Sequence, residues 1–347
     1  MSERVALGLF SGGLDSILAC RTVADQGVRV VALKFVTPFF DHDLLAQQRE
    51  YGDAMRRKYG LEVEVVDISA GYLRLLDNPA HGFGKHFNPC IDCKILMLTK
   101  ARELMSAHGA AFLLTGEVLG QRPMSQRRDT LRVIERDSGC AGLLLRPLCA
   151  KLMPPTRAEL DGLVDRERLH GFSGRGRKEQ KQLAARLGIA DYPTPAGGCM
   201  LTDPNLAARI KHFYQGLFSF GEERAVDDIR LLTVGRQFKL DDDTWLILGR
   251  SERENDRLLT MRGPDDWLLR MATRPGPLGL LRHARSKLAG TDREEEILRR
   301  AAGLVVRYGR KEEGIVSPAE VRIDQGDASV QARFAPLADA EFAAWRI

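Results

Sequence analysis

No long apolar run occurs in this 347-residue sequence, whereas a helix that crosses a bilayer needs about 18 such residues in a row. An apolar segment begins within a few residues of Met1, where a signal peptide would carry basic residues, so we expect no secretion signal. Internal repeats and low-complexity segments are also missing. These absences favour a cytoplasmic globular protein with no membrane partner.

Cysteine is scarce too, with six residues in the whole chain. Small folds held together by disulfides use cysteine far more densely, so we expect reduced thiols, metal ligands or catalytic groups. Basic residues slightly outnumber acidic ones, and the net charge of +5 is compatible with an RNA partner without establishing one. The length suffices for one large domain or two.

The most informative motif is Ser-Gly-Gly-Leu-Asp-Ser at residues 11–16. It lies between the apolar run 5–10, which predicts a short buried strand, and the amphipathic stretch 14–26, which predicts a helix. Two adjacent glycines let backbone N–H groups converge on an anion at the positive end of that helix. Because the Gly-Lys-Ser/Thr ending of a Walker loop is absent, the motif predicts a phosphate site of another kind.

Strand and helix signals alternate through the first third of the chain. Strands are expected at 5–10, 28–36, 61–66 and 110–114, and helices at 14–26, 43–59 and 93–108. This alternation predicts a parallel sheet covered on both faces, with ligands beyond the carboxyl ends of the strands. A mainly helical stretch is expected at 147–214. Further along, strands at 229–234, 238–240, 245–248 and 265–271 and a polar helix at 251–261 predict a separate α+β module.

Three of the six cysteines lie where a chemical role is favoured. Cys90 and Cys93 form a Cys-x-x-Cys pair at a predicted helix start, where the helix dipole favours thiolate over thiol. Cys199 follows two glycines in a loop. The spacing leaves open a zinc site with His86 as fourth ligand, a redox or persulfide pair, and an iron–sulfur cluster with three protein ligands. The other cysteines are expected to be inert packing residues: Cys20, Cys140 and Cys149.

The hexapeptide at 11–16 resembles the pyrophosphate loop of the PP-loop ATP pyrophosphatase superfamily. With Pro-Cys-Ile-Asp-Cys-Lys at 89–94 and the segments 115–121 and 125–126, it is similar to the PP-loop domain of the 4-thiouridine synthetases over about residues 1–215. The segments 234–238 and 249–256 resemble the RNA-binding module of the NFACT proteins.

These resemblances imply an α/β fold, an adenine nucleotide alpha hydrolase-like parallel sheet with helices on both faces, followed by a C-terminal α+β domain. The expected parts are a PP-loop ATP pyrophosphatase domain at 1–150, a helical extension at 151–216 that carries Cys199 and completes the catalytic domain, and an NFACT-like RNA-binding domain at 217–330.

The implied function is that of an ATP-dependent tRNA sulfurtransferase, which adenylates a uridine carbonyl oxygen and replaces it with sulfur. The expected product is 4-thiouridine, formed with ATP, Mg²⁺ and a [4Fe–4S] cluster. A 2-thiouridine synthetase of the anticodon and a small-molecule PP-loop ligase are the alternatives. We expect neither a THUMP nor a rhodanese domain, so the C-terminal module would bind tRNA and the cluster would hold sulfide. The sulfur donor would be inorganic sulfide or a cysteine desulfurase system, and a homodimer is left open.

Candidate site residues follow from the resemblance and from position along the strands. The expected ATP-binding residues are Ser11, Gly12, Gly13, Asp15, Ser16, Lys34, Phe35, Gly116 and Gln121. The expected catalytic residues are Asp15, which would hold Mg²⁺ or orient the loop, and the cluster ligands Cys90, Cys93 and Cys199. The expected RNA contacts are Arg122, Ser125, Gln126, Arg127, Arg128, Arg175, Arg177 and Lys178. For Phe35 a place in the core is an equal alternative, as is a solvated surface for the basic runs.

Overall fold

The computed structural model describes residues 4–194, 198–218, 225–311, 313–326 and 328–347, so Gly197 of the Gly-Gly-Cys segment lies outside the described residues. The chain divides into two compact units, Met1–Asp203 and Pro204–Ile347. The sequence predicts this boundary at 216/217, and the difference concerns helix α8 (Pro204–Tyr214). This helix groups with the second unit, where the Phe213 ring lies 6.0 Å from the Trp245 ring.

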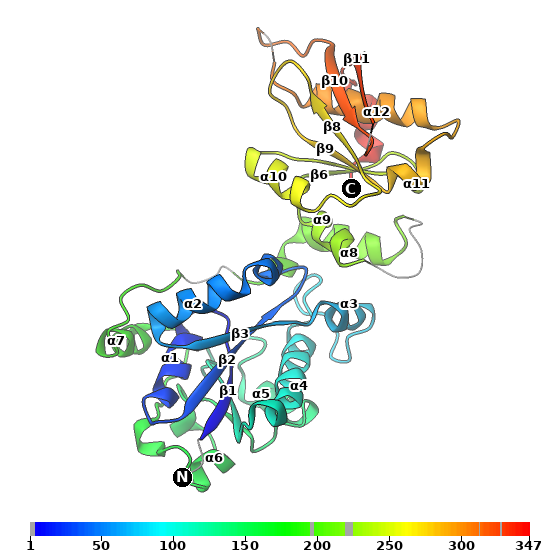
Figure 1. Ribbon diagram of the computed structural model, residues 1–347. Coiled ribbons are helices and arrows are strands. Elements are labelled where there is room, and N and C mark those ends of the chain that lie inside the picture. The colour runs from blue at the N-terminus through cyan, green and yellow to red at the C-terminus, as the bar shows by residue number, and fades with distance from the viewer. Residues whose placement is uncertain (1–3, 195–197, 219–224, 312, 327) are drawn as a thin grey trace. The chain divides into compact units, whose positions relative to one another are not determined.

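The first unit alternates parallel strands with helices, as the sequence predicts (Figure 1). Its strands are β1 (Val5–Leu9), β2 (Arg29–Val36), β3 (Glu62–Asp67), β4 (Phe112–Thr115) and β5 (Leu144–Leu145). Its helices are α1 (Leu14–Ala24), α2 (Gln48–Tyr59), α3 (Ser69–Asp77), α4 (Cys90–His108), α5 (Arg128–Asp137), α6 (Arg157–Leu160) and α7 (Lys178–Arg186). The helix expected at 43–59 is divided, because a 3₁₀ turn at His42–Ala46 precedes α2.

The strand order is β3-β2-β1-β4-β5, and every neighbouring pair is parallel. The chain moves from β1 to β2 and β3 on one side and only later adds β4 and β5 on the other. The loops that follow β1 and β4 therefore lie next to each other at the carboxyl edge of the sheet, where folds of this type bind their ligands.

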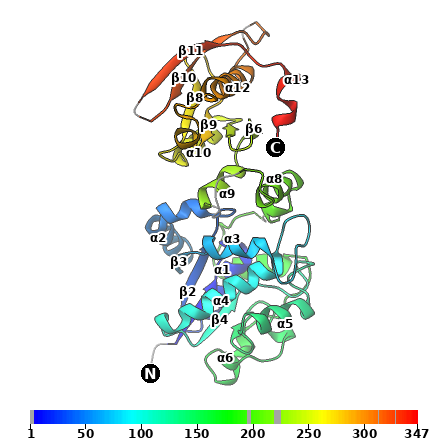
Figure 2. The ribbon, with the colours of Figure 1, turned by 90° about the vertical axis from the view of Figure 1, so that its right-hand side faces the viewer.

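Helices cover both faces of this sheet. On one face, Ile17 of α1 and Leu183 of α7 belong to a buried apolar cluster. On the other, Leu98 of α4 and Ile134 of α5 belong to a second cluster, and Figure 2 shows this side of the unit. The sheet is thus enclosed between two helical layers, which confirms the predicted fold class.

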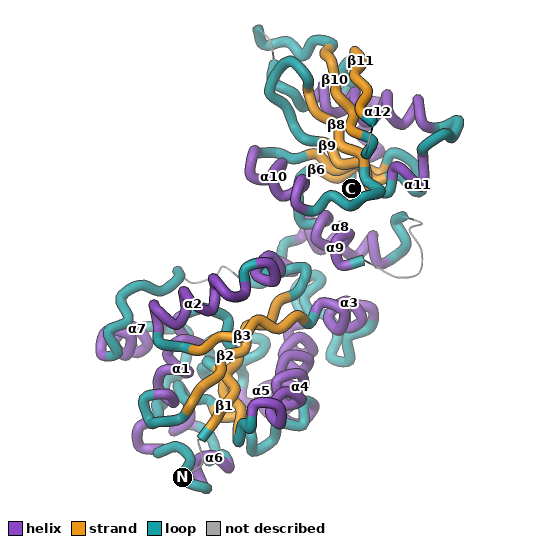
Figure 3. The backbone as a smooth tube through the Cα atoms, viewed as in Figure 1, coloured by secondary structure: helices purple, strands orange, loops and turns teal. Residues whose placement is uncertain are grey.

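The second unit contains an antiparallel sheet, drawn as orange strands in Figure 3. Its strands are β6 (Arg236–Lys239), β7 (Trp245–Leu248), β8 (Trp267–Met271), β9 (Gly279–Arg282), β10 (Ala319–Asp324) and β11 (Ser329–Phe334), in the order β11-β10-β8-β9-β7-β6. Its helices are α8, α9 (Val226–Leu232), α10 (Glu252–Thr260), α11 (Ala284–Leu288), α12 (Glu294–Arg307) and α13 (Asp339–Phe342). Helix α12 packs against the sheet and buries one apolar core with it, as an α+β module requires.

One predicted strand of this unit is wrong. The residues at 229–234 were expected to be extended, but most of them belong to helix α9. Asp227 and Asp228 occupy the first turn of α9, where carboxylates interact favourably with the helix dipole. A short apolar run cannot by itself distinguish a buried strand from a buried helical turn.

No helix among the described residues is both long enough and apolar enough to span a bilayer.

Candidate active site

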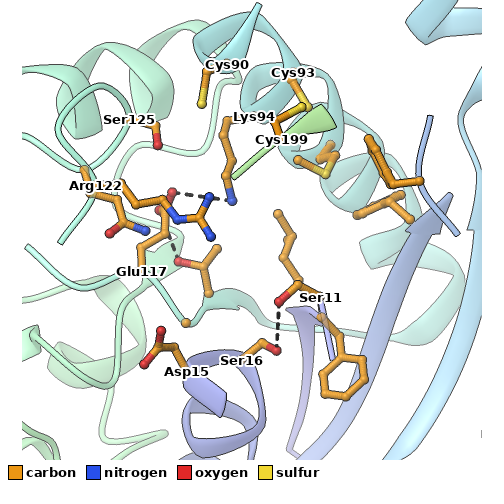
Figure 4. A pocket seen from close by; sticks show the side chains of 18 of the residues that line it. Ser11, Asp15, Ser16, Cys90, Cys93, Lys94, Glu117, Arg122, Ser125 and Cys199 are labelled. Atoms are coloured by element: carbon orange, nitrogen blue, oxygen red, sulfur yellow. Dashed lines mark hydrogen bonds and ion pairs between the residues drawn. The ribbon is translucent and has the colours of Figure 1, made fainter. Parts of the chain in front are cut away.

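A cavity of about 590 Å³ opens at the carboxyl edge of the parallel sheet. Most of the predicted site residues line it: Ser11, Asp15, Ser16, Lys34, Phe35, Cys90, Cys93, Gly116, Arg122, Ser125, Gln126 and Cys199. Figure 4 shows the loop at residues 11–16, here called the phosphate loop, on one side of the cavity and the three cysteines on the opposite side. The structure therefore brings together two motifs that the sequence separates by more than 70 residues.

The phosphate loop is held by its own two serines. The Ser11 hydroxyl donates to the Ser16 hydroxyl oxygen at 3.2 Å, and the Ser16 hydroxyl donates to the Gly13 carbonyl at 2.8 Å. Gly12 has φ +80°, a conformation that residues with a Cβ rarely adopt. Gly13 precedes the first residue of α1, so the loop ends at the positive end of that helix. This geometry suits an anion, as the sequence predicts.

Gly116 allows the loop after β4 to approach the phosphate loop. A Cβ at this position would lie 2.5 Å from the Asp15 carbonyl carbon and 2.6 Å from the Ser16 nitrogen. Both are backbone atoms, so neither can rotate away as a flexible side chain would. Gly116 is thus required for this contact between the two loops.

Asp15 is oriented by residues that come from far along the chain. Gln121 donates to its Oδ2 at 3.1 Å, and the Arg177 guanidinium lies 3.4 Å from the same oxygen. Burial raises the pKa of Asp15, although Arg177 and Gln121 act in the opposite direction. Its Oδ1 is buried and has no hydrogen-bond partner within the described residues. A carboxylate oxygen left in this state fits a cation ligand, and Gln121 supports Asp15 instead of lining the cavity itself.

The three cysteines reach the cavity from two segments. Cys90 and Cys93 lie in the first turn of α4, and Cys199 precedes a 3₁₀ turn at Met200–Thr202. All three are free, half-buried thiols, whereas the cysteines expected to be packing residues are buried: Cys20, Cys140 and Cys149. The exposure of the six thiols therefore follows the two predicted groups.

The prediction that the helix dipole favours a thiolate is wrong for Cys93. Desolvation, with a smaller contribution from negative charge at Cys90 and Cys199, raises the pKa of Cys93 to about 12, although Lys94 acts in the opposite direction. Burial also raises the pKa of Cys199. Because these thiols oppose one another's ionisation, thiolates at these positions need a cation beside them.

The three thiols fit the protein ligands of an iron–sulfur cluster. No three His, Cys, Asp or Glu side chains among the described residues are grouped closely enough to hold one metal ion, and His86 does not line the cavity. Zinc requires ligands that converge on a single point. The thiolates of a [4Fe–4S] cluster bind different irons, so three thiols that line one cavity suit it.

An ion-pair network that sequence reasoning missed forms another wall of the cavity. The Lys94 ammonium lies 3.7 Å from Glu117 Oε1, and Arg146 donates to Glu117 Oε2 at 3.1 Å and also to Glu135. Burial alone would raise the pKa of Glu117, but Lys94 and Arg146 outweigh it and hold the pKa below its usual value. Lys94 directly follows the Cys-x-x-Cys pair and Glu117 follows Thr-Gly at a strand end, and these positions were the available signals.

Lys34 and Phe35 are both buried at the cavity wall. Lys34 donates to the Ser11 carbonyl at 2.9 Å and pairs with Asp41 at 2.5 Å. It thus holds the first residue of the phosphate loop in place. Phe35 also belongs to an apolar core cluster, so its predicted place in the core is confirmed, whereas its contact with the nucleotide stays a prediction. Phe39 and Phe40, which the sequence analysis missed, add an aromatic surface to the same cavity.

The predicted RNA contacts separate into two groups. Arg122, Ser125 and Gln126 line the cavity, and the last two are buried. The remaining basic residues do not line it: Arg127, Arg128, Arg175, Arg177 and Lys178. Within this second group, Arg127 pairs with Asp129, Arg128 donates to the Leu152 carbonyl and Arg177 contacts Asp15. Arg175 and Lys178 are exposed.

Comparison with known families agrees with this geometry. Residues 1–151 match the family model described as thiamine biosynthesis protein (ThiI). This match covers less than half of the chain. Residues 235–346 match the model described as NFACT protein RNA binding domain, so the second unit carries a domain of that kind. The two matches confirm both resemblances found in the sequence.

Individual proteins similar to the chain include two solved structures. One is a 4-thiouridine synthetase–RNA complex with bound ATP, with 21% identity, coverage of 54% of this chain and 52% of that one, and a TM-score of 0.34. The other is the U34-tRNA thiolase NcsA from Methanococcus maripaludis with its [4Fe–4S] cluster, with 16% identity, coverage of 60% and 67%, and a TM-score of 0.32.

A curated protein is also similar to part of this chain. The probable tRNA sulfurtransferase of Thermococcus kodakarensis is 24% identical over 143 residues, which are 41% of this chain. The chain spans only 36% of the length of that relative.

Proposed function

We propose that the protein is an ATP-dependent tRNA sulfurtransferase that forms 4-thiouridine. One observation carries the proposal: the phosphate loop and the thiols of Cys90, Cys93 and Cys199 line the same cavity. The ThiI-family match and the similarity to a probable tRNA sulfurtransferase support the reaction type. The RNA-binding domain in the same chain supports RNA as the substrate.

The proposed reaction has two steps, because oxide is a poor leaving group. The uridine carbonyl oxygen attacks the α-phosphorus of ATP, the bond to the β-phosphate oxygen breaks, and pyrophosphate leaves. Sulfide then attacks the activated carbon, and AMP departs with the original oxygen. The sulfide is inorganic sulfide, or it comes from the persulfide of a cysteine desulfurase after a thiol has reduced that persulfide by two electrons. The base must leave its stack to enter the cavity.

The chain's own residues supply binding and charge. The Ser11 and Ser16 hydroxyls and the start of α1 bind the phosphates, and Lys94 presents a cation to the same cavity. Asp15, whose Oδ1 has no hydrogen-bond partner among the described residues, would hold Mg²⁺, which would offset the charge of the phosphates. A [4Fe–4S] cluster on the three thiolates would supply an iron without a protein ligand, at which hydrosulfide can be held.

The decisive experiment is an anaerobic assay of the full chain with tRNA transcript, ATP, Mg²⁺ and sulfide. We expect the wild type to contain iron and acid-labile sulfide, to release AMP and pyrophosphate, and to form 4-thiouridine that mass spectrometry of nucleosides detects. We expect Cys199→Ser to lose the iron and the thiolated product. Cys140→Ser is the matched control, since Cys140 is a buried thiol that does not line the cavity.

Three outcomes would contradict the proposal. Stoichiometric zinc without iron would exclude the cluster. A thiolated product that carries sulfur at the 2-position would exclude 4-thiouridine. Turnover of ATP that depends on a small metabolite and not on tRNA would point to a PP-loop ligase.

A further inference from the structure

The second unit has a cavity of its own, of about 330 Å³, which lies at the edge strand β6. Three arginines and a tyrosine line it: Arg209 of α8, Arg236 of β6, Tyr308 just after α12, and Arg346 near the chain end. Gln237, Phe238 and Ile347 complete the lining, and no carboxylate side chain takes part among the described residues. Arg209 donates to the main-chain oxygen of Ile347 at 3.3 Å, so the positive charge of the cavity comes chiefly from Arg236 and Arg346.

Backbone pairing fixes one of these arginines. Arg346 forms an antiparallel bridge with Phe238, and the Ile347 N–H donates to the Gln237 carbonyl at 3.1 Å. The last residues of the chain thus lie along the outer edge of β6. As a result Arg346 is placed on the same strand edge as Arg236, although 110 residues separate the two in sequence.

Tyr308 links the same two arginines. The Arg236 guanidinium carbon lies 4.5 Å from the centre of the Tyr308 ring, and Arg346 donates to the Tyr308 hydroxyl at 2.9 Å. The Tyr308 ring packs against Phe238 and Phe342, which lie in the core. Stacking on an aromatic ring leaves the N–H edges of a guanidinium available for another acceptor.

Arg236 and Arg346 differ from other arginines of the unit in how their charge is compensated. Arg300 and Arg307 of α12 pair with Glu296 and Asp339, at 2.7 and 2.9 Å. Within the described residues, neither Arg236 nor Arg346 lies within ion-pair distance of a carboxylate. Two guanidinium groups that lie side by side without a carboxylate within ion-pair distance favour an oxyanion with several acceptor oxygens.

We propose that this cavity binds a backbone phosphate of the RNA substrate. That this RNA is a tRNA rests on the proposed function. That the cavity binds a phosphate rests only on the arginines that line it. Arg236, Tyr308 and Arg346 lie inside the segment that matches an RNA-binding domain, and Arg209 adds a cation from outside it. Contacts of this kind position a nucleic acid without reading its bases.

The test measures tRNA binding by fluorescence anisotropy, without ATP or sulfide, over a series of salt concentrations. We expect the double variant Arg236→Gln/Arg346→Gln to bind a tRNA transcript at least about tenfold more weakly. The slope of log affinity against log salt should become shallower by about one for each phosphate that the variant no longer neutralises. Arg285→Gln, which removes an exposed arginine of the same unit that does not line the cavity, is the matched control.

Several results would overturn the inference. These are wild-type affinity and salt slope in the double variant, or an equally weakened affinity in Arg285→Gln. Millimolar binding of inorganic phosphate that the double variant loses while its tRNA affinity stays unchanged would assign the cavity to a free anion instead.

The outcome is separable from that of the proposed function. A wild type that binds tRNA through the arginines but never forms thiouridine contradicts only the proposed function. A double variant that thiolates tRNA with wild-type kcat/KM contradicts only the inference about this cavity.

Discussion

Each unit of the protein buries an arginine between two carboxylates, and the two arrangements differ in what surrounds them. In the second unit, Arg282 donates to Asp228 at 2.7 Å and to Asp266 at 2.8 Å. Asp266 also accepts from the backbone N–H groups of Gly263 and His283. In the first unit, Arg146 bridges Glu117 and Glu135, but Glu117 keeps one oxygen without a hydrogen bond to any described residue and faces the cavity.

The difference indicates separate roles for two similar ion pairs. The Arg282 group satisfies its charges within the fold, so its effect is expected on stability alone. The Arg146 group holds Glu117 at the cavity, where Glu117 in turn faces Lys94. A buried ion pair that leaves an atom unsatisfied beside a cavity is a candidate for positioning chemistry, whereas a fully satisfied one is not.

The largest effect is expected from Arg282→Met. Removing the guanidinium leaves Asp228 and Asp266 buried without a counter-charge, which should lower the free energy of unfolding by about 3–5 kcal/mol. The three tryptophans at 245, 267 and 345 all belong to the second unit, so urea unfolding followed by tryptophan fluorescence reports this unit selectively. A midpoint equal to that of the wild type would show that the ion pair contributes nothing.

A smaller loss of stability and a larger loss of activity are expected from Glu117→Gln. The amide keeps the shape but not the charge, so the free energy of unfolding should fall by about 1–3 kcal/mol, measured by circular dichroism. Lys94 would lose its partner, and kcat should fall by roughly ten- to hundredfold with the KM for tRNA unchanged. Asp228→Asn is the matched control, with a comparable stability loss and wild-type kcat. Equal kcat in both variants would remove the distinction between the two groups.

The smallest effect is expected from Glu296→Gln on α12. Glu296 pairs with Arg299 and Arg300, which lower its pKa to about 2. A lowered pKa stabilises the fold above the unfolded pKa of about 4.3, and this contribution is lost as the pH falls towards 2. Because the group is largely exposed, the loss at pH 7 should stay within about 0.5 kcal/mol. A shift above about 1 kcal/mol in tryptophan-detected unfolding would mean that surface pairs matter here as much as buried ones.

The sequence predicted the elements whose signal is local. Ser11–Ser16 carries its glycines and its flanking strand and helix within a few residues, and the alternation that follows gave the parallel sheet. The thiols of Cys90 and Cys93 were placed by their spacing. What failed depends on tertiary surroundings: the thiol pKa of Cys93 is governed by desolvation, and helix α9 is short enough for an apolar run to fit either structure.

The contacts of Asp15 could not be read from the sequence for the same reason. The sequence predicts Arg177 as an RNA contact, whereas in the structure its guanidinium lies 3.4 Å from Asp15. The two residues are 162 positions apart, and only the tertiary fold brings them together. The roles of Gly116 and Glu117 became visible only when the two loops were placed side by side.

Residues 152–203, which follow the segment that matches the ThiI model, determine where the protein can be shortened. A fragment that stops at residue 151 would retain the phosphate loop, Cys90 and Cys93, yet it would lack Arg177 and Cys199. It would also uncover an apolar sheet face that Phe172 and Leu183 protect, and exposed apolar area of that kind promotes aggregation. A fragment that ends at Asp203 keeps every described residue of the first unit's cavity. It is therefore the fragment to prepare for crystallisation or spectroscopy.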